Sequence, residues 1–312
     1  MALTLTEGNK YSRTELAGYV IDRLGKETEV LSKLPFVEIL GNSWTYDTFT
    51  TRSTANFYSV GDTWVESTPV MTQATASLVI LGKDADIDNF IRKTRSNILD
   101  VKGEVLGESI KAVSEKFMDT FWYGGVTSVN AKEFDGLQTL IANTTYNTIH
   151  AGTTSGSALS VVKLQQAIDL ITFNTPTDLF MTKAMRRGIN VYLDSIGDKF
   201  TAVRNEYGKM IEYFRGLKIT TDDHLLDTET ASTGAYSAST GSDNSTIFIL
   251  SFGPKAVCGI QGPDQVETIP LGDLETKDAQ RWRIRWYCGL KFEDLRSCSK
   301  LDGITTASTV TA

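Results

Sequence analysis

The pattern of apolar and polar residues over residues 86–125 predicts a short helix followed by a long one. In the long helix the apolar positions are three or four residues apart, which places them on one face: Leu106, Ile110, Val113, Phe117 and Phe121. Asp86 is the expected N-cap of the short helix, and Gly124 with Gly125 is expected to end the long one. A helix with one apolar face is expected to lie against a flat surface.

Two segments before these helices, residues 43–51 and 68–81, are rich in Thr, Tyr, Val and Ile, which favour strands. With a turn expected at Gly61-Asp62, they form one long hairpin with few apolar side chains of its own. An isolated hairpin is at best marginally stable in water. We therefore expect the hairpin to lie on the surface of a partner, and an exposed loop on a monomer is the alternative.

The rest of the chain predicts an anchor, an α/β portion and a β-rich final third. The anchor follows a mixed-charge segment over residues 1–33 and consists of Val30, Leu31, Leu34 and Phe36. Buried strands are expected at 178–183 and 245–252, and one or two strands within 208–221. A helix is expected before them at 157–171, and another at 184–195. Residues 222–246 include a Ser/Thr/Gly-rich stretch that is expected to be a surface loop.

A long strand over residues 281–292 carries a row of arginines. Arg281, Arg283 and Arg285 alternate with large apolar residues such as Trp282 and Ile284. This period of two predicts one face in the core and the arginines on the other. The row is typical of a solvated or intersubunit face, and an anion site is the alternative.

Composition limits the classes of function. The chain has 312 residues, 41% of them hydrophobic, and a formal net charge of -7, which argues against a nucleic-acid binder. No segment is apolar and long enough to span a membrane, and the first residues do not resemble a secretory signal. The three cysteines show no metal or disulfide spacing, so we expect reduced, buried thiols of a cytosolic protein: Cys258, Cys288 and Cys298.

Motifs of catalysis and cofactor binding are missing from the sequence. It contains no P-loop, no nucleophile elbow and no dinucleotide-binding glycine pattern. The string Asp84-Ala85-Asp86-Ile87-Asp88 copies the start of a calcium loop, but Asn89 and Arg95 occupy positions that need Gly and a carboxylate. Acids at the start of a helix are the simpler interpretation. Asp222 and Asp223 beside His224 form at most a chance cluster of ligands. We expect no catalytic residue, metal or cofactor.

The order of elements resembles that of the major capsid proteins of tailed bacteriophages, which have the Hong Kong 97-like fold that encapsulin shells share. The resemblance covers essentially the whole chain. It rests on the arm, the hairpin ending in LVILGKDADIDNFI, the helix closing at FWYGG, an FDGL segment, a small α/β portion and a late pair of long strands.

The resemblance implies an α+β fold with four parts. Residues 1–42 form an N-arm and anchor, and residues 43–84 form the extended hairpin loop. Residues 85–135 and 259–292 form a peripheral domain with a long spine helix. Residues 136–258 and 293–312 form the axial α/β domain. Hinges are expected near residues 97–102 and at the two roots of the hairpin, around Gly41 and Gly82.

The implied function is self-assembly into pentamers and hexamers of an icosahedral shell around double-stranded DNA, in the virion and assembled in the host cytoplasm. Expected partners are copies of the chain, a separate scaffolding protein, a portal and decoration proteins, with DNA held only as enclosed cargo. An encapsulin-type compartment is one alternative, and a cytosolic enzyme using residues 136–258 is another. Candidate intersubunit contacts are Arg52, Phe57, Tyr58, Trp64, Glu66, Arg92, Arg95, Arg281, Arg283 and Arg285.

One departure from some members of this family concerns covalent linkage. Those members cross-link through a lysine on the extended loop, but here no lysine occurs between Ser43 and Ile80, and Arg52 is the single basic residue. We therefore expect a shell without isopeptide bonds.

Overall fold

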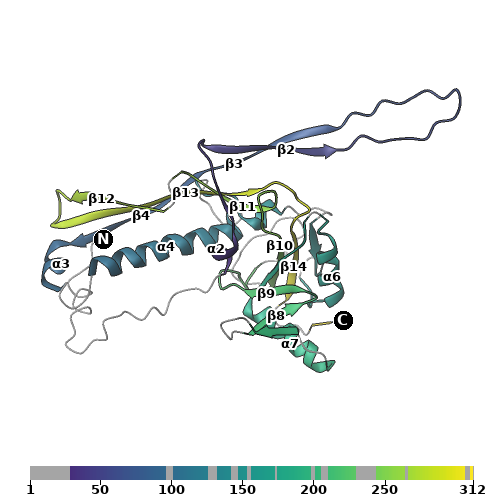
Figure 1. Ribbon diagram of the computed structural model, residues 1–312. Helices are drawn as coiled ribbons and strands as arrows, with labels where there is room; N and C mark the ends of the chain where they lie inside the picture. Colours follow the sequence, from purple (N-terminus) through teal and green to yellow (C-terminus); the bar gives the residue numbers. More distant parts are fainter. Residues whose placement is uncertain are drawn as a thin grey trace.

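The computed structural model describes residues 29–95, 101–125, 132–141, 147–152, 156–172, 174–197, 201–204, 210–229, 244–263, 266–305 and 310–311. The predicted N-arm up to residue 28, most of the hinge over 97–102 and the Ser/Thr-rich loop over 230–243 lie outside these residues. Within them, the strands form three sheets of five, seven and two strands. Figure 1 shows an elongated sheet lying over a long helix, a second sheet at one end, and a hairpin that protrudes from the body.

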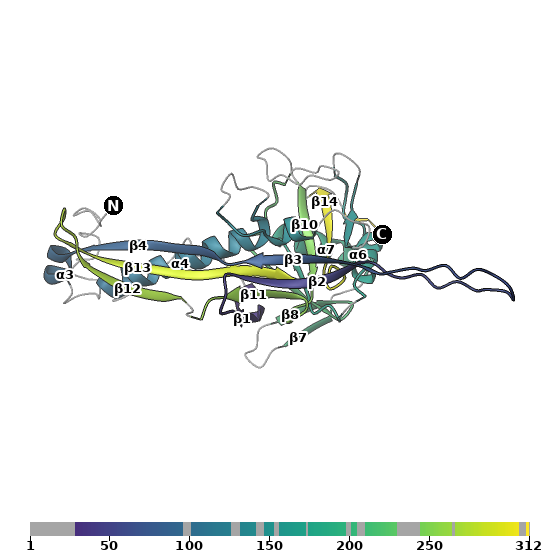
Figure 2. The same cartoon turned by 90° about the horizontal axis from the view of Figure 1, so that it is seen from above.

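The five-stranded sheet is built around one long strand, β13 (Ala279–Phe292). Its neighbours are β4 (Val79–Asp88), β12 (Glu267–Asp273) and β11 (Val257–Gln261), all antiparallel to it. The short strand β1 (Phe36–Glu38) adds to β11 in parallel. Helix α4 (Val101–Tyr123) lies along one face of this sheet, and α3 (Asn89–Arg95) lies at its far end (Figures 1 and 2). The flat surface expected for the long helix is therefore this sheet.

The apolar stripe of α4 is confirmed in its second half and fails at one position in the first. Val113, Phe117 and Phe121 are buried, whereas Ile110 is 39% exposed. The difference follows from what covers the helix. Val113, Phe117 and Phe121 belong to a core cluster with side chains of both large sheets, including Phe180 and Trp286, and Leu106 packs against its edge. Near Ile110 the sheet covers one side of the helix, so a side chain at the margin of the stripe stays in water.

The start of α3 corrects the expected N-cap. Asp86 lies within β4, opposite Arg281, and does not cap a helix. The cap is Asp88, whose Oδ1 accepts the N–H groups of Phe90 at 2.8 Å and Ile91 at 3.2 Å. Asp84, Asp86 and Asp88 alternate along the end of β4, and the pairing of β4 with β13 leaves only Asp88 at the start of the helix. The predicted end of α4 is confirmed at Tyr123, where Gly125 adopts a φ of 76°.

The seven-stranded sheet forms the second module. Its order is β5 (Thr148–His150), β14 (Ser299–Thr305), β10 (Asn244–Leu250), β6 (Asp178–Met181), β9 (Leu217–Thr221), β8 (Met210–Phe214) and β7 (Thr201–Arg204). Helices α6 (Val161–Asp169) and α7 (Lys183–Ser195) pack in this module, and the short α5 (Leu137–Leu140) follows α4. The strands predicted within 178–183, 208–221 and 245–252 and both helices are confirmed.

The hairpin is the third element of the architecture. Strands β2 (Ser43–Thr51) and β3 (Val70–Ser77) pair antiparallel, with Ser43 opposite Ser77. Beyond Leu78 the chain enters β4, so the hairpin grows directly out of the five-stranded sheet. Figure 2 shows that it extends past the seven-stranded sheet, at the opposite end of the molecule from α3.

Candidate assembly surfaces

The root of the hairpin is fixed to the body by its aromatic residues. Trp44 donates from Nε1 to Glu293 Oε1 at 3.1 Å, and Tyr46 donates from Oη to the carbonyl oxygen of Phe292 at 2.8 Å. Lys291 Nζ lies 4.4 Å from the centre of a Trp44 ring. Burial, assisted by the charge of Glu293, raises the pKa of Tyr46, so its hydroxyl remains a donor at neutral pH. The direction in which the hairpin leaves the body is thus set by specific contacts.

The tip of the hairpin, residues 52–69, is ordered by contacts of its own. The rings of Tyr58 and Trp64 stack with centroids 4.3 Å apart, and Tyr58 Oη accepts the N–H of Val65 at 3.1 Å. The turn is closed by Asp62 N–H donating to Ser59 O at 3.2 Å, and Gly61 supplies the positive φ of 97° that this turn requires. The predicted turn at Gly61 is therefore confirmed.

The hairpin exposes more apolar surface than the sequence pattern suggested. Trp64 is 79% exposed, and Phe49 faces Met71 across the strands on the side turned to solvent. Such a concentration of exposed apolar side chains on one protruding element is typical of a contact surface. The exposed residues are Phe49, Phe57, Val60, Trp64, Val65, Val70 and Met71.

The predicted arginine row forms a ladder of ion pairs within the chain. Arg281 binds both carboxylate oxygens of Asp86, at 2.6 and 2.8 Å. Arg283 binds Asp84 in the same way, at 2.7 and 2.8 Å. The hydrogen bonds from these guanidinium groups hold the pKa of Asp84 and of Asp86 below the usual range.

The third arginine reaches the opposite strand. Arg285 Nε lies 2.6 Å from Glu267 Oε2 on β12. Each of the three guanidinium groups therefore faces a carboxylate on β4 or β12. This pairing disfavours the alternative of an anion site, because the positive charges of the row are already matched by carboxylates. The predicted alternation is confirmed at Ile284, Trp286 and Cys288, which are buried on the other face. Trp282, at the start of the row, is only half-buried, and Lys102 Nζ lies 3.9 Å from the centre of a ring of this side chain.

The structure brings the candidate intersubunit residues to three separate surfaces. The hairpin tip holds Arg52, Phe57, Tyr58, Trp64 and Glu66. The far end of the sheet holds α3, where Arg92 donates to Gln280 Oε1 at 2.7 Å; the backbone of Arg95 is described, and its side chain is not. The third surface is the arginine ladder, on the sheet between these two ends.

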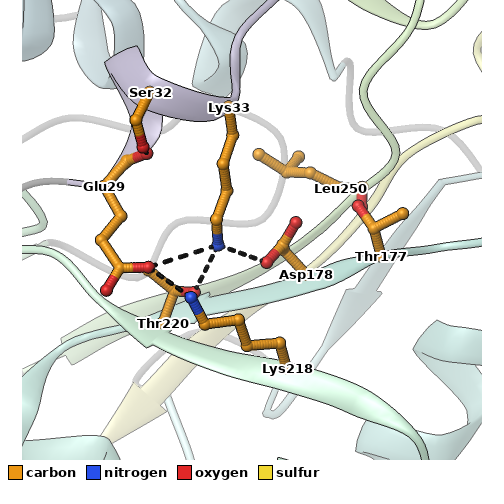
Figure 3. Close-up of polar contacts among 8 residues, drawn as sticks. All are labelled: Glu29, Ser32, Lys33, Thr177, Asp178, Lys218, Thr220 and Leu250. Carbon is orange, nitrogen blue, oxygen red and sulfur yellow. Dashed lines mark hydrogen bonds and ion pairs between the residues drawn. The ribbon is translucent and has the colours of Figure 1, made fainter. Parts of the chain in front are cut away.

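A polar cluster that the sequence did not predict connects residues 29–33 to the seven-stranded sheet (Figure 3). In α2 (Val30–Lys33), Lys33 Nζ lies 2.5 Å from Asp178 Oδ1 and donates to Thr220 Oγ1 at 3.0 Å. Lys218 Nζ lies 2.5 Å from Glu29 Oε2. Partners separated by 145 or 189 residues leave no local signal in the sequence. The predicted apolar anchor at Val30 and Leu34 is confirmed by their burial.

The described residues contain neither a group of metal ligands nor a helix that could span a membrane. Among the described residues, no three His, Cys, Asp or Glu side chains lie close enough together to bind a metal ion. His224 is buried, and its Nδ1 lies 2.7 Å from Asp119 Oδ1 on α4, so it is part of the core rather than of a flexible loop. The three cysteines are free and buried, as predicted. Within the described part of the chain, no helix has the length and apolar character needed to cross a membrane.

Together, the spine-like helix under a long sheet, the protruding hairpin and the seven-stranded sheet define an α+β molecule with the Hong Kong 97-like fold. No family model and no curated protein matches the sequence. Solved structures do match, over nearly the full chain.

The holo-SrpI encapsulin complex from Synechococcus elongatus PCC 7942 matches with a TM-score of 0.72 and 14% identity, over 100% of this chain and 99% of that one. The capsid of the native GTA particle matches with a TM-score of 0.68 and 11% identity, over 97% and 99%. The structure of Mycobacterium phage Ogopogo matches with a TM-score of 0.63 and 15% identity, over 96% and 99%. At these identities, the likeness is one of fold.

Proposed function

We propose that the chain is the structural subunit of a closed icosahedral shell, which copies of it build through pentamers and hexamers. The observation that carries this proposal is the hairpin, which is fixed at its root by Trp44 and Tyr46 and exposes Phe57, Trp64 and Val65 far from the body. These side chains have no core to join within one chain. A neighbouring copy would remove them from water, at about 25 cal/mol for each Å² of apolar surface buried.

The geometry favours a contact between different surfaces of two copies. The hairpin lies at one end of the molecule and α3 lies at the other (Figure 2). The arginine ladder lies near α3, because Arg281 on β13 pairs with Asp86, shortly before that helix begins at Asn89. A repeated contact between unlike surfaces closes into a ring when the rotation that relates neighbouring copies is a whole fraction of a full turn. Because each subunit in such a lattice touches several neighbours, weak contacts add to a strong assembly. The residues proposed for these contacts are the ten predicted from the sequence.

For the contents of the shell we propose double-stranded DNA, as in a phage capsid. A net charge of -7 suits an inner wall that encloses DNA without binding it tightly. A separate scaffolding protein, a portal and decoration proteins would then act with the chain in the host cytoplasm. The proposed role is structural, without catalysis, and it agrees with the fold and with the lack of catalytic motifs in the sequence.

An encapsulin-type compartment is the second candidate. The match to the holo-SrpI encapsulin complex over the full length of both chains favours it. Here the shell would enclose protein cargo. The two candidates share the subunit contacts and differ in what the shell contains.

The test is negative-stain electron microscopy of the purified chain, expressed with and without its neighbouring genes. We expect closed shells or rings. Nuclease-protected DNA inside would support the phage capsid, and a co-purifying protein inside would support the encapsulin. A uniform monomer under both conditions would refute the shell.

Two variants test whether the hairpin tip is part of the contact between copies. Trp64→Ser should abolish or strongly reduce assembly while the melting temperature of the monomer changes little, because an exposed side chain contributes little to the fold. The matched control is Val162→Ser, which removes an exposed apolar side chain from α6 on the body and should leave assembly intact. Normal shells from the Trp64 variant would remove the hairpin tip from the proposed interface.

A further inference from the structure

A carboxyl group is buried at the joint between α4 and the seven-stranded sheet. Glu229 is 0% exposed. Tyr123, the last residue of α4, donates its hydroxyl to Glu229 Oε1 and accepts the N–H of Leu226 at 2.9 Å. Thr246 Oγ1 on β10 lies 2.6 Å from Glu229 Oε2, so this hydroxyl can donate to the ionised carboxylate or accept the proton of the neutral acid. One carboxyl group therefore joins the end of the long helix, the segment before residue 229 and a central strand.

The surroundings of this carboxyl group disfavour a negative charge. The carboxyl group is shielded from water, so its charged form loses hydration. A second buried carboxylate, Asp302 on β14, acts on Glu229 from the neighbouring strand and is itself 2.5 Å from His150. Lys300 is the cation that opposes them, and it is buried as well.

Burial shifts the pKa values of Glu229, Asp302 and Lys300 so that the neutral form of each group is favoured. Burial raises the pKa of Glu229 to about 8, against the hydrogen bonds from Thr246 and Tyr123, which lower it. Burial also raises the pKa of Asp302 and lowers that of Lys300. The pKa of Tyr123 lies well above its ordinary value because the ring is buried and faces Glu229, with Asp227 adding to the shift. At neutral pH, Tyr123 therefore remains a neutral donor.

We propose that Glu229 is protonated while α4 is docked on the seven-stranded sheet, and that the joint opens with release of this proton. The joint is then a proton-sensitive hinge between the two modules. This inference concerns the folded subunit and does not rest on the proposed shell.

The sign of the pH dependence follows from the two protonation states. In the open joint Glu229 is exposed to water and ionises near its ordinary pKa of 4.5, whereas in the closed joint it keeps its proton up to about pH 8. Between these values the open state binds fewer protons, so a rise in pH favours opening, by up to about tenfold per pH unit. Above about pH 8 both states are ionised, and the dependence on pH levels off.

The test is hydrogen exchange of the amides in residues 117–125, corrected for the intrinsic rate, from about pH 5.5 to 9. We expect the opening constant of the wild type to rise through this range and level off at its end. Glu229→Gln keeps a neutral polar side chain of the same size and removes the proton released at this position, so its opening constant should rise much less steeply with pH than that of the wild type. Glu108→Gln, an exposed position of α4, is the control and should follow the wild type.

A second measurement on the wild type covers the case in which the variant folds poorly. The infrared spectrum at neutral pH should contain the C=O stretching band of a buried carboxylic acid, which disappears as the pH passes about 8. Tyr123→Phe removes one hydrogen bond to the carboxyl group and should shift this band without abolishing it. Parallel pH profiles for the wild type and Glu229→Gln, or a neutral-pH spectrum without the acid band, would overturn the proposal.

Discussion

Gly107 within α4 and Gly124 directly after its end differ in the space around them, and this difference predicts opposite effects of the same substitution. A Cβ at Gly124 would lie 2.6 Å from the carbonyl oxygen of Thr120 and even closer to that of Phe134. A Cβ at Gly107 would meet nothing within 4 Å. Gly124→Ala should therefore lower the free energy of unfolding by about 2 kcal/mol, because backbone must move. Gly107→Ala should raise it by about 0.5–1 kcal/mol, because alanine favours the helix.

Urea denaturation of both variants checks this pair. The sequence predicts Gly124 as part of the helix end and says nothing of the space around either glycine, so the opposite signs come from packing. Equal effects of the two substitutions would contradict the close approach of the Phe134 backbone to the end of α4.

At the scale of single residues, the sequence also predicts which side chains are buried wherever a local pattern decides it. Ile284, Trp286 and Cys288 alternate with the arginines and are buried, as period two requires. The partners of the arginines are not predictable in this way. Asp84 and Asp86 were assigned to a helix start, and pairing of β4 with β13, nearly two hundred residues away, places them opposite Arg283 and Arg281.

At the scale of elements, the anchoring of α2 to the seven-stranded sheet gives a prediction about ion pairs. The carboxylate of Asp178 is 8% exposed and lies 2.5 Å from Lys33, whose side chain is 21% exposed. Lys33→Met leaves this carboxylate with poor access to water and should destabilise the chain by about 2 kcal/mol, less than the ~3–5 kcal/mol for a fully buried pair.

A more exposed pair on α7 is the matched control. Lys183 lies 2.8 Å from Asp223, with side chains 54% and 28% exposed. Lys183→Met should cost less than about 1 kcal/mol, because water replaces the lost partner. Denaturation midpoints of the two variants, measured at low and high salt, separate the cases. Equal costs would mean that the cluster around Lys33 is as well solvated as the surface pair.

The elements themselves were largely predictable, because most depend on local periodicity. The long helix, the hairpin, the strands at 178–181 and 244–250 and the long strand of the last third lie where the patterns place them. The misplaced boundary near Asp86 has a physical cause. Residues 79–88 carry both strand-like and helix-starting features, and a long-range sheet partner decides between them.

At the scale of the whole molecule, the order of elements led to the fold, whereas the joint between the modules left no trace in the sequence. Tyr123, Glu229 and Thr246 lie in three separate segments, each with an ordinary local pattern. The same limit applies to contacts between copies. The exposed residues of the hairpin indicate that a partner exists, and their receiving surface depends on the arrangement of a second molecule.

The composition of the hairpin predicts how an assembled shell is held together. Isopeptide bonds between subunits need a lysine amine at the contact, and the hairpin from Ser43 to Ile80 has none. The contacts that we propose for it are the apolar surface around Trp64 and Phe57, with Arg52 and Glu66 as charged groups. Shells boiled in detergent with reductant should therefore release single chains of 34.3 kDa on an electrophoresis gel. A ladder of covalently linked multiples would contradict this, and would place the linking lysine on another surface. Because apolar contacts do not weaken with salt, shells should also survive salt concentrations that screen surface ion pairs, which light scattering would follow.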